Sequence, residues 1–183
     1  MKRIFTIILF CSFFVSINAQ EKEFIEEAHK IERSNVLLLN GLFNSSKFGF
    51  GIKYKSLYSI KRSLQVGWGV GLESFSSGVE RNFIPLSIDV VGDLFENGPT
   101  PFYMISTGYG IALKEDPEFA TESSGGFMLD VSLGYRVKRD KTHSFISFGY
   151  RLQDASYQGT DQYGNTDKEV IYKRWSLSLG TFF

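Results

Sequence analysis

The feature that most constrains this 183-residue chain is an alternation of apolar residues with small or polar ones, repeated in eight segments. Successive side chains of a β-strand point to opposite faces, so a period of two predicts strands with one apolar face. The segment 174–183, RWSLSLGTFF, shows the pattern most clearly. The eight predicted strands cover residues 35–43, 48–59, 64–75, 82–94, 101–113, 126–137, 143–154 and 170–183.

The second face of these strands is rich in glycine, serine and charged residues. Glycine is a poor residue for the solvated surface of a strand. It suits the inside of a narrow barrel, where little room remains for side chains. We therefore expect the apolar face to point to lipid and the small, polar face to the lumen. Leu133 and Leu177 are predicted to face lipid, whereas Ser147 and Ser178 are predicted to face the lumen.

The N-terminal part differs from the rest of the chain. A basic pair and an apolar run that ends at Val15 precede Ala19, which predicts a signal peptide over residues 1–19. Residues 20–34 are charged, free of glycine and proline, and good helix formers, so we expect a short helix or a periplasmic tether. The barrel domain is predicted over residues 35–183.

After Ala19 no apolar run is long enough for a membrane-spanning helix. A closed barrel is then the remaining way to cross lipid, because an open sheet edge would leave backbone groups unpaired. Longer connections at 114–125 and 154–169 alternate with short turns, which is typical of outer-membrane barrels whose termini are periplasmic. The sequence therefore predicts an all-β, eight-stranded antiparallel up-and-down barrel in the cell outer membrane.

Several functional classes find little support. The one cysteine, Cys11, lies in the predicted signal peptide, so we expect neither a disulfide nor a cysteine nucleophile. Removal of the signal leaves twenty acidic and eighteen basic residues, a net charge of about −2, which argues against a nucleic-acid partner. Adjacent His143 and Ser144 should point to opposite faces and have no evident carboxylate. The oxygen-rich segment 161–169 lacks the spacing of an EF-hand, so we expect no metal or cofactor.

Charged residues also fall on the predicted lumen face. Buried charges are costly unless paired, and eight strands enclose little more than side-chain space, so we predict a salt-bridged, hydrated plug. Asp130, Arg151 and Arg174 should lie close together, because their strands are neighbours. Glu73 should reach them across the lumen. The full predicted set is Lys53, Lys55, Glu73, Asp89, Asp130, Arg136, Arg151 and Arg174.

Aromatic residues near the predicted strand ends suggest two belts at the membrane interfaces. The predicted periplasmic belt contains Tyr58, Phe95, Tyr103, Tyr135 and Phe183. The predicted outer belt contains Phe75, Phe83, Phe127 and Trp175.

With its N-terminal signal, the stretch FIPLSIDVVGDLFENGPTPFYMISTGYG and the terminal Phe183, the chain resembles small outer-membrane β-barrel proteins common in Bacteroidota. Their architecture is that of the eight-stranded OmpA and OmpX types. The resemblance implies the fold and the location. It also implies that the barrel-assembly machinery reads the C-terminal strand, with Trp175, Leu177, Leu179 and Phe183 as the signal, although Thr181 departs from the usual pattern.

The function predicted from the sequence is a non-enzymatic envelope or surface role. The connections at 114–125 and 154–169 would contact an extracellular partner, and the other expected partners are outer-membrane lipid and the assembly machinery. The alternatives are a narrow channel, which needs a continuous hydrated lumen, and a lipid-modifying enzyme, which needs a His-Ser-carboxylate cluster. At the level of the fold, the alternative is a soluble, secreted ligand-binding barrel.

Overall fold

The computed structural model describes residues 32–45, 47–75, 81–95, 99–113, 122–139, 142–161 and 164–183. The predicted signal peptide and nearly all of the predicted tether lie outside these residues. No helix in the described ranges is long and apolar enough to cross a membrane. The strands are β1 Arg33–Asn44, β2 Lys47–Lys61, β3 Leu64–Phe75, β4 Arg81–Asp93, β5 Thr100–Ala112, β6 Glu122–Ser124, β7 Gly126–Arg139, β8 Thr142–Asp161 and β9 Gly164–Phe182.

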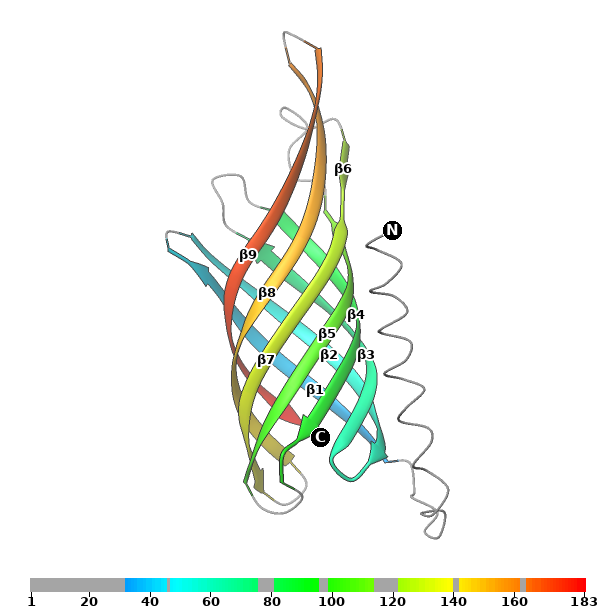
Figure 1. The fold of residues 1–183 in the computed structure, drawn as a ribbon, viewed down its shortest axis with the longest axis vertical. Helices are drawn as coiled ribbons and strands as arrows, with labels where there is room; N and C mark the ends of the chain where they lie inside the picture. Colours follow the sequence, from blue (N-terminus) through cyan, green and yellow to red (C-terminus); the bar gives the residue numbers. More distant parts are fainter. Residues whose placement is uncertain are drawn as a thin grey trace, which may run out of the picture. The chain divides into compact units, whose positions relative to one another are not determined.

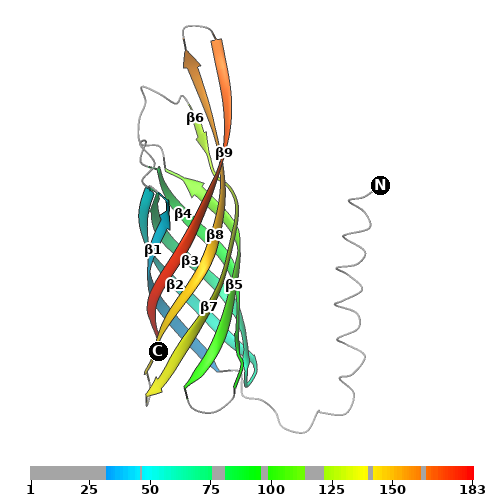
Figure 2. The same cartoon turned by 60° about the vertical axis from the view of Figure 1, so that its left-hand side comes forward.

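Eight of these strands form a closed antiparallel barrel (Figures 1 and 2). Each long strand pairs with the next in the chain, and β9 returns to pair with β1. Next to this seam, Asn35 and Phe183 exchange both backbone hydrogen bonds, at 2.8 and 2.9 Å. The short β6 pairs only with β8, at the end of the barrel where β7 begins. The predicted eight-stranded barrel is therefore confirmed.

The hairpin of β8 and β9 is longer than the sequence predicted. β8 continues to Asp161 and β9 begins at Gly164, so most of the predicted 154–169 loop is strand. Both ribbons extend well beyond the other strands in Figures 1 and 2. The predicted 114–125 connection likewise contains β6. These segments lack the apolar alternation that lipid imposes, and their many polar residues resemble those of a loop.

The two faces of the barrel wall have the predicted orientation. Leu133 is 67% exposed and Leu177 is 44% exposed, whereas Ser147 and Ser178 are 3% and 8% exposed. Exposed leucine, isoleucine, valine and aromatic side chains cover the outside of every long strand. A soluble barrel would bury this apolar face, so the exterior supports a barrel whose surroundings are lipid.

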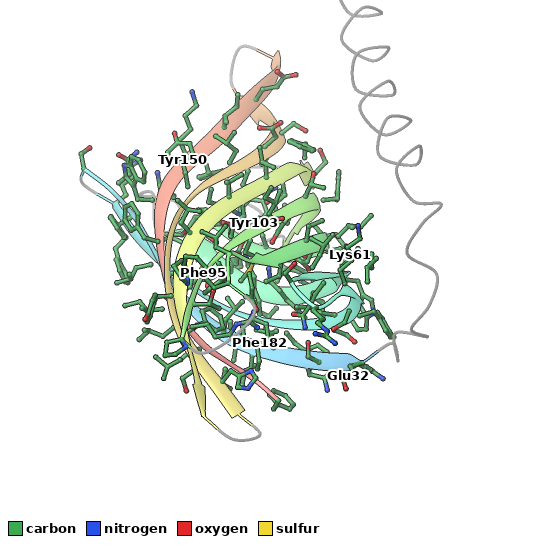
Figure 3. All side chains as sticks on the ribbon, turned by 60° about the horizontal axis from the view of Figure 1, so that its bottom comes forward. Glu32, Lys61, Phe95, Tyr103, Tyr150 and Phe182 are labelled. Atoms are coloured by element: carbon green, nitrogen blue, oxygen red, sulfur yellow. The ribbon has the colours of Figure 1, made fainter. Side chains whose placement is uncertain are left out.

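The interior is filled in layers, and Figure 3 shows side chains on both the inner and the outer side of the wall. One apolar cluster lies toward the ends at which the chain enters and leaves the barrel, and it includes Phe102, Phe145 and Phe182. A second apolar cluster lies toward the opposite end and consists of Leu42, Phe75, Phe83, Ala155 and Tyr172. Buried charged and hydroxyl side chains occupy the space between the two clusters.

Two predicted members of the outer aromatic belt are inside the barrel instead. Phe75 and Phe83 are fully buried, with their rings 5.4 Å apart and nearly perpendicular. Alternation explains the error, because Phe75 lies two residues after the inward-facing Glu73. Phe127 and Trp175, the other two members, are 51% and 47% exposed on the outside.

We predict that arginine at Leu133 or Leu177 destabilises the folded barrel by about 2–4 kcal/mol, because each leucine faces the hydrocarbon region. Urea unfolding in lipid vesicles measures the change. Cysteine at the same two positions should react with a lipid-soluble maleimide, whereas cysteine at Ser147 or Ser178 should be protected. Labelling at the serines and protection at the leucines would reverse the assigned orientation.

Candidate functional site

Four charged side chains form a closed ring inside the barrel. Lys53 Nζ lies 2.8 Å from Glu73 Oε1 and 3.2 Å from Asp130 Oδ2. Arg151 completes the ring by pairing with Glu73 and, at 3.4 Å, with Asp130. Each cation thus touches two carboxylates, and each carboxylate touches two cations. This arrangement compensates all four buried charges without outside partners.

The ring joins opposite walls of the barrel. Lys53 and Glu73 lie on neighbouring β2 and β3, whereas Asp130 and Arg151 lie on neighbouring β7 and β8. In the strand order, β4 and β5 separate the two pairs on one side, and β1 and β9 separate them on the other. The four side chains therefore cross the lumen instead of bridging adjacent strands alone.

A second ionic cluster, centred on Lys55, lies beside the ring. Lys55 Nζ lies 2.7 Å from Asp89 Oδ1 and donates a hydrogen bond of 2.7 Å to Ser106 Oγ. Asp89 also accepts a hydrogen bond of 2.9 Å from Ser87. Because Lys53 and Lys55 are alternate residues of β2, this one strand supplies a cation to both clusters.

Glycines make the room for these long side chains. In the antiparallel ladders, Gly51 lies opposite Glu73 and Gly71 lies opposite Lys53. A Cβ atom on Gly51 would approach Glu73 Cγ to 2.7 Å, and one on Gly71 would approach Lys53 Cγ to 2.7 Å. The same pairing holds for Lys55, which lies opposite Gly69. The glycine-rich GWGVG stretch of β3 therefore accommodates the charges of the neighbouring strands.

A small polar cavity lies against the two clusters, with a volume of about 10 Å³. Asn40 Oδ1 and Ser147 Oγ line this cavity and have no hydrogen-bond partner among the described residues. The volume is close to that of one water molecule, and a buried water needs two or more polar partners. The site therefore suits a single bridging water and is too small for an organic ligand.

Aromatic layers close the interior on both sides of the charges. Toward the β8–β9 hairpin, Tyr172 packs against Phe75 and Phe83, with ring centroids 5.2 and 5.7 Å apart. Toward the end at which β1 begins, Phe145 packs against Phe102 and Phe182 at 5.4 and 5.3 Å. The charged residues therefore lie between two aromatic layers.

The remaining two predicted lumen residues lie outside the ring. Arg136 pairs with Asp93 near the end at which β1 begins, and its guanidinium lies 4.3 Å from the centroid of the Phe182 ring. Arg174 is 4% exposed and lies opposite Arg151 in the ladder, but it forms no salt bridge with a described carboxylate. Lys53 therefore takes the place in the ring that the sequence analysis gave to Arg174.

The residues of the predicted assembly signal lie on the outside of the wall, along β9 and at Phe183 directly after it. Trp175, Leu177, Leu179 and Phe183 are 47%, 44%, 56% and 53% exposed. Trp175 stacks on Phe148 of the neighbouring β8, with the ring planes 14° apart. The four side chains thus form one apolar row, which ends at the Phe183 backbone pair with Asn35.

The described residues contain no group of three or more side chains suited to hold a metal ion. His143 and Ser144 are adjacent on β8, and the Ser144 side chain is on the exposed side of the wall. In the oxygen-rich segment 161–169, only Glu169 has a described side chain, and it is exposed.

Comparisons with known proteins agree with the barrel. No family model and no curated protein matches the chain. Among solved structures, outer membrane protein AlkL in DMPC lipid bilayers matches with a TM-score of 0.53 and 15% identity, covering 89% of this chain and 95% of AlkL. The N-terminal β-barrel domain of Pseudomonas aeruginosa OprF matches with a TM-score of 0.44 and 12% identity, covering 84% of this chain and 100% of that domain.

A major outer membrane protein from Thermus thermophilus also matches, with a TM-score of 0.44 and 14% identity, covering 83% of this chain and 98% of that protein. At such identities the likeness concerns the fold alone. The closed barrel, its apolar exterior and the fold shared with AlkL agree with the predicted location in the cell outer membrane.

We predict that Glu73 and Arg151 are energetically coupled by at least about 1 kcal/mol, because they are buried partners in one network. A double-mutant cycle with Glu73→Gln and Arg151→Met, followed by urea unfolding in vesicles, measures this coupling. Arg151→Met alone should cost about 3–5 kcal/mol if the ring is dry, because it leaves two carboxylates with one cation.

Arg174→Met is the matched control, since Arg174 lies on the facing strand without a described carboxylate partner. It should cost less than Arg151→Met. Additive effects of the Glu73 and Arg151 substitutions, or equal costs at the two arginines, would show that the ring does not stabilise the barrel.

A separate prediction concerns assembly. Deletion of Phe183 should lower the amount of folded barrel in the outer membrane, because it removes both the terminal aromatic ring and a backbone pair at the seam. Phe183→Leu keeps the backbone pair and removes only the aromatic ring. Heat-modifiable mobility in gels measures the folded fraction. If the assembly machinery reads the aromatic ring, the folded fraction should be lower for both variants. An unchanged folded fraction in both variants would contradict an assembly role.

Proposed function

We propose that the protein is a non-enzymatic outer-membrane surface protein that binds an extended segment of an extracellular partner along the free edge of β9. The observation that carries this proposal is the unequal length of the strands at the β1–β9 seam. β9 pairs with β1 only between Trp175 and Phe182, although the strand begins at Gly164. On this side, no described strand covers β9 beyond Trp175.

The direction of the backbone groups along this edge follows from the seam. Phe183 exchanges both backbone bonds with Asn35, so its N–H and C=O point toward β1. In an antiparallel ladder these groups alternate in direction from one residue to the next. Glu169, Ile171 and Lys173 therefore point theirs to the uncovered side. Asn44 agrees with this assignment, because its side-chain amide donates to the Lys173 carbonyl at 3.3 Å.

The position of the edge relative to the membrane supports an extracellular role. Unpaired backbone N–H and C=O groups are not tolerated in hydrocarbon. The segment from Lys173 toward Gly164 must then lie outside the hydrocarbon region, and the seam closes where the lipid-facing row begins. An exposed strand edge is a template to which an extended peptide adds as a further strand, with main-chain hydrogen bonds supplying affinity.

The side chains along the edge indicate what kind of segment fits. Glu169 and Lys173 are exposed and oppositely charged, and Ile171 between them is 58% exposed. A partner strand with an apolar residue flanked by opposite charges would pair with these three across the ladder. The partner segment is therefore an extended, mixed-charge peptide with an apolar centre.

The interior gives the competing functions less support. A channel needs a continuous hydrated lumen, whereas the described interior is crossed by the charged ring and bounded by two aromatic layers. A lipid-modifying enzyme needs a nucleophile and a base within hydrogen-bond reach near the lipid face. The adjacent His143 and Ser144 side chains lie on opposite sides of β8. We also propose that the chain is one of the small outer-membrane barrel proteins of Bacteroidota, a proposal supported by the sequence resemblance.

The edge assignment predicts a clear pattern of amide exchange. In the barrel reconstituted in bilayers, the amides of Glu169 and Ile171 should exchange at least about tenfold faster than those of Val170 and Tyr172, which point toward β8. A displayed library of extended peptides then supplies binders. A bound peptide should slow exchange at Glu169 and Ile171 and leave Val170 and Tyr172 unchanged.

Proline substitutions provide a matched pair of variants. Proline is tolerated on a strand edge where its missing N–H had no partner. Glu169→Pro should therefore keep the hairpin folded and abolish peptide binding, whereas Val170→Pro should disrupt the hairpin itself. Peptides that bind Glu169→Pro as well as the unaltered protein would contradict strand addition at this edge.

A further inference from the structure

A hollow of about 300 Å³ interrupts the lipid-facing surface at β4, β5 and β7. It is lined by the outward-facing Leu86, Ile88, Thr107 and Phe127 and, between them, by Ser87 and Gly108. The volume is at the lower end of the range of small-molecule pockets. The hollow therefore differs in size from the single-water cavity of the lumen.

The strand register explains why the surface is hollow here. Leu86, Tyr109 and Phe127 lie side by side in one row across the three strands. In the next row, Thr107 lies between Ile88 and Leu129. The short Thr107 side chain therefore leaves a gap between Ile88 of its own row and Leu86 and Phe127 of the next row.

The hollow belongs to the outer half of the membrane. The barrel begins and ends at its periplasmic end, so β5 runs outward from Thr100 to Ala112, and Thr107 lies past its middle. Phe127 is the second residue of β7, which descends from the outer end. Phe127, a predicted member of the outer aromatic belt, is 51% exposed, and its neighbour Tyr109 is 49% exposed. The hollow thus lies in the outer half of the wall, beside Phe127 of that belt.

The hydroxyl of Thr107 makes no hydrogen bond within the described part of the chain. Apolar residues surround it on the outside of the wall, and no hydrogen bond joins it to another described residue. In contrast, Thr181, another outward-facing threonine, donates a hydrogen bond of 3.4 Å to the Phe182 carbonyl. A hydroxyl group in hydrocarbon without a hydrogen bond is unfavourable, so a lipid oxygen at this depth would stabilise it.

We propose that this hollow binds one acyl chain of an outer-leaflet lipid, with an ester or hydroxyl oxygen of the chain hydrogen-bonded to Thr107. We infer an acyl chain as the ligand because the hollow opens on the lipid-facing surface of the barrel and its lining is largely apolar. The polar atom in this lining selects a chain that carries an oxygen near the headgroup. This site is independent of the β9 edge and of any extracellular partner.

Native mass spectrometry of the barrel, extracted from outer membranes in mild detergent, tests the proposal. The unaltered protein should carry one retained lipid. Thr107→Leu fills the hollow and should lose that lipid. Thr107→Val keeps the shape, removes the hydroxyl group and should reduce retention about fivefold, the effect of one hydrogen bond. Thr181→Val is the matched control and should retain lipid as the unaltered protein does.

Only heat-modifiable, folded protein is compared, so a folding defect cannot imitate lipid loss. Equal lipid retention by the unaltered protein and by Thr107→Leu would overturn the proposal, as would the absence of any retained lipid. A dimer that Thr107→Leu abolishes would also overturn it, because the hollow would then be a contact between two copies.

Discussion

The ring of Lys53, Glu73, Asp130 and Arg151 is the interaction on which the rest of the interior depends. It compensates four buried charges with one another and does so across the lumen, between walls that share no backbone hydrogen bonds. A barrel wall is continuous in its ladder but has nothing inside to fix its cross-section except side chains. The ring supplies that connection, and the glycines opposite its members provide the space for it.

The interior of the barrel is packed with side chains, so the candidate binding surfaces lie on the outside of the molecule. Aromatic rings pack on both sides of the charges, and the polar cavity beside the charges has a volume of only about 10 Å³. Two features of the described exterior stand out instead. One is the edge of β9 beyond Trp175, and the other is the hollow over Thr107 on the lipid-facing wall.

The two-residue alternation predicted the strands, their orientation and the set of inward charges because lipid imposes that pattern directly. The alternation also predicts that Phe75 and Phe83 face inward, because they lie an even number of residues from Glu73 and Asp89 on the same strands. The prediction of an aromatic belt used only their position near the strand ends and therefore placed them outside. Alternation predicts that both Lys53 and Arg174 face the lumen, but it does not predict which of them joins the ring. Contacts across the lumen depend on which residues of opposite strands lie at the same height in the barrel.

Features outside the membrane escaped prediction for a different reason. Beyond Asp154 the sequence of β8 lacks the apolar alternation that lipid imposes, so it resembles a loop. The hollow over Thr107 escaped as well, because it depends on which residues of three strands are neighbours. Register of this kind becomes visible only in the assembled sheet.

The most direct test of a closed, cross-braced interior is electrical. The barrel, reconstituted in a planar bilayer and recorded in potassium chloride, is predicted to give no stable conductance, because the ring and the two aromatic layers block ion passage. Replacement of Phe75, Phe83 and Tyr172 by alanine should leave the ring in place and still give no open channel. Long-lived, uniform conductance steps from the unaltered protein would contradict the account.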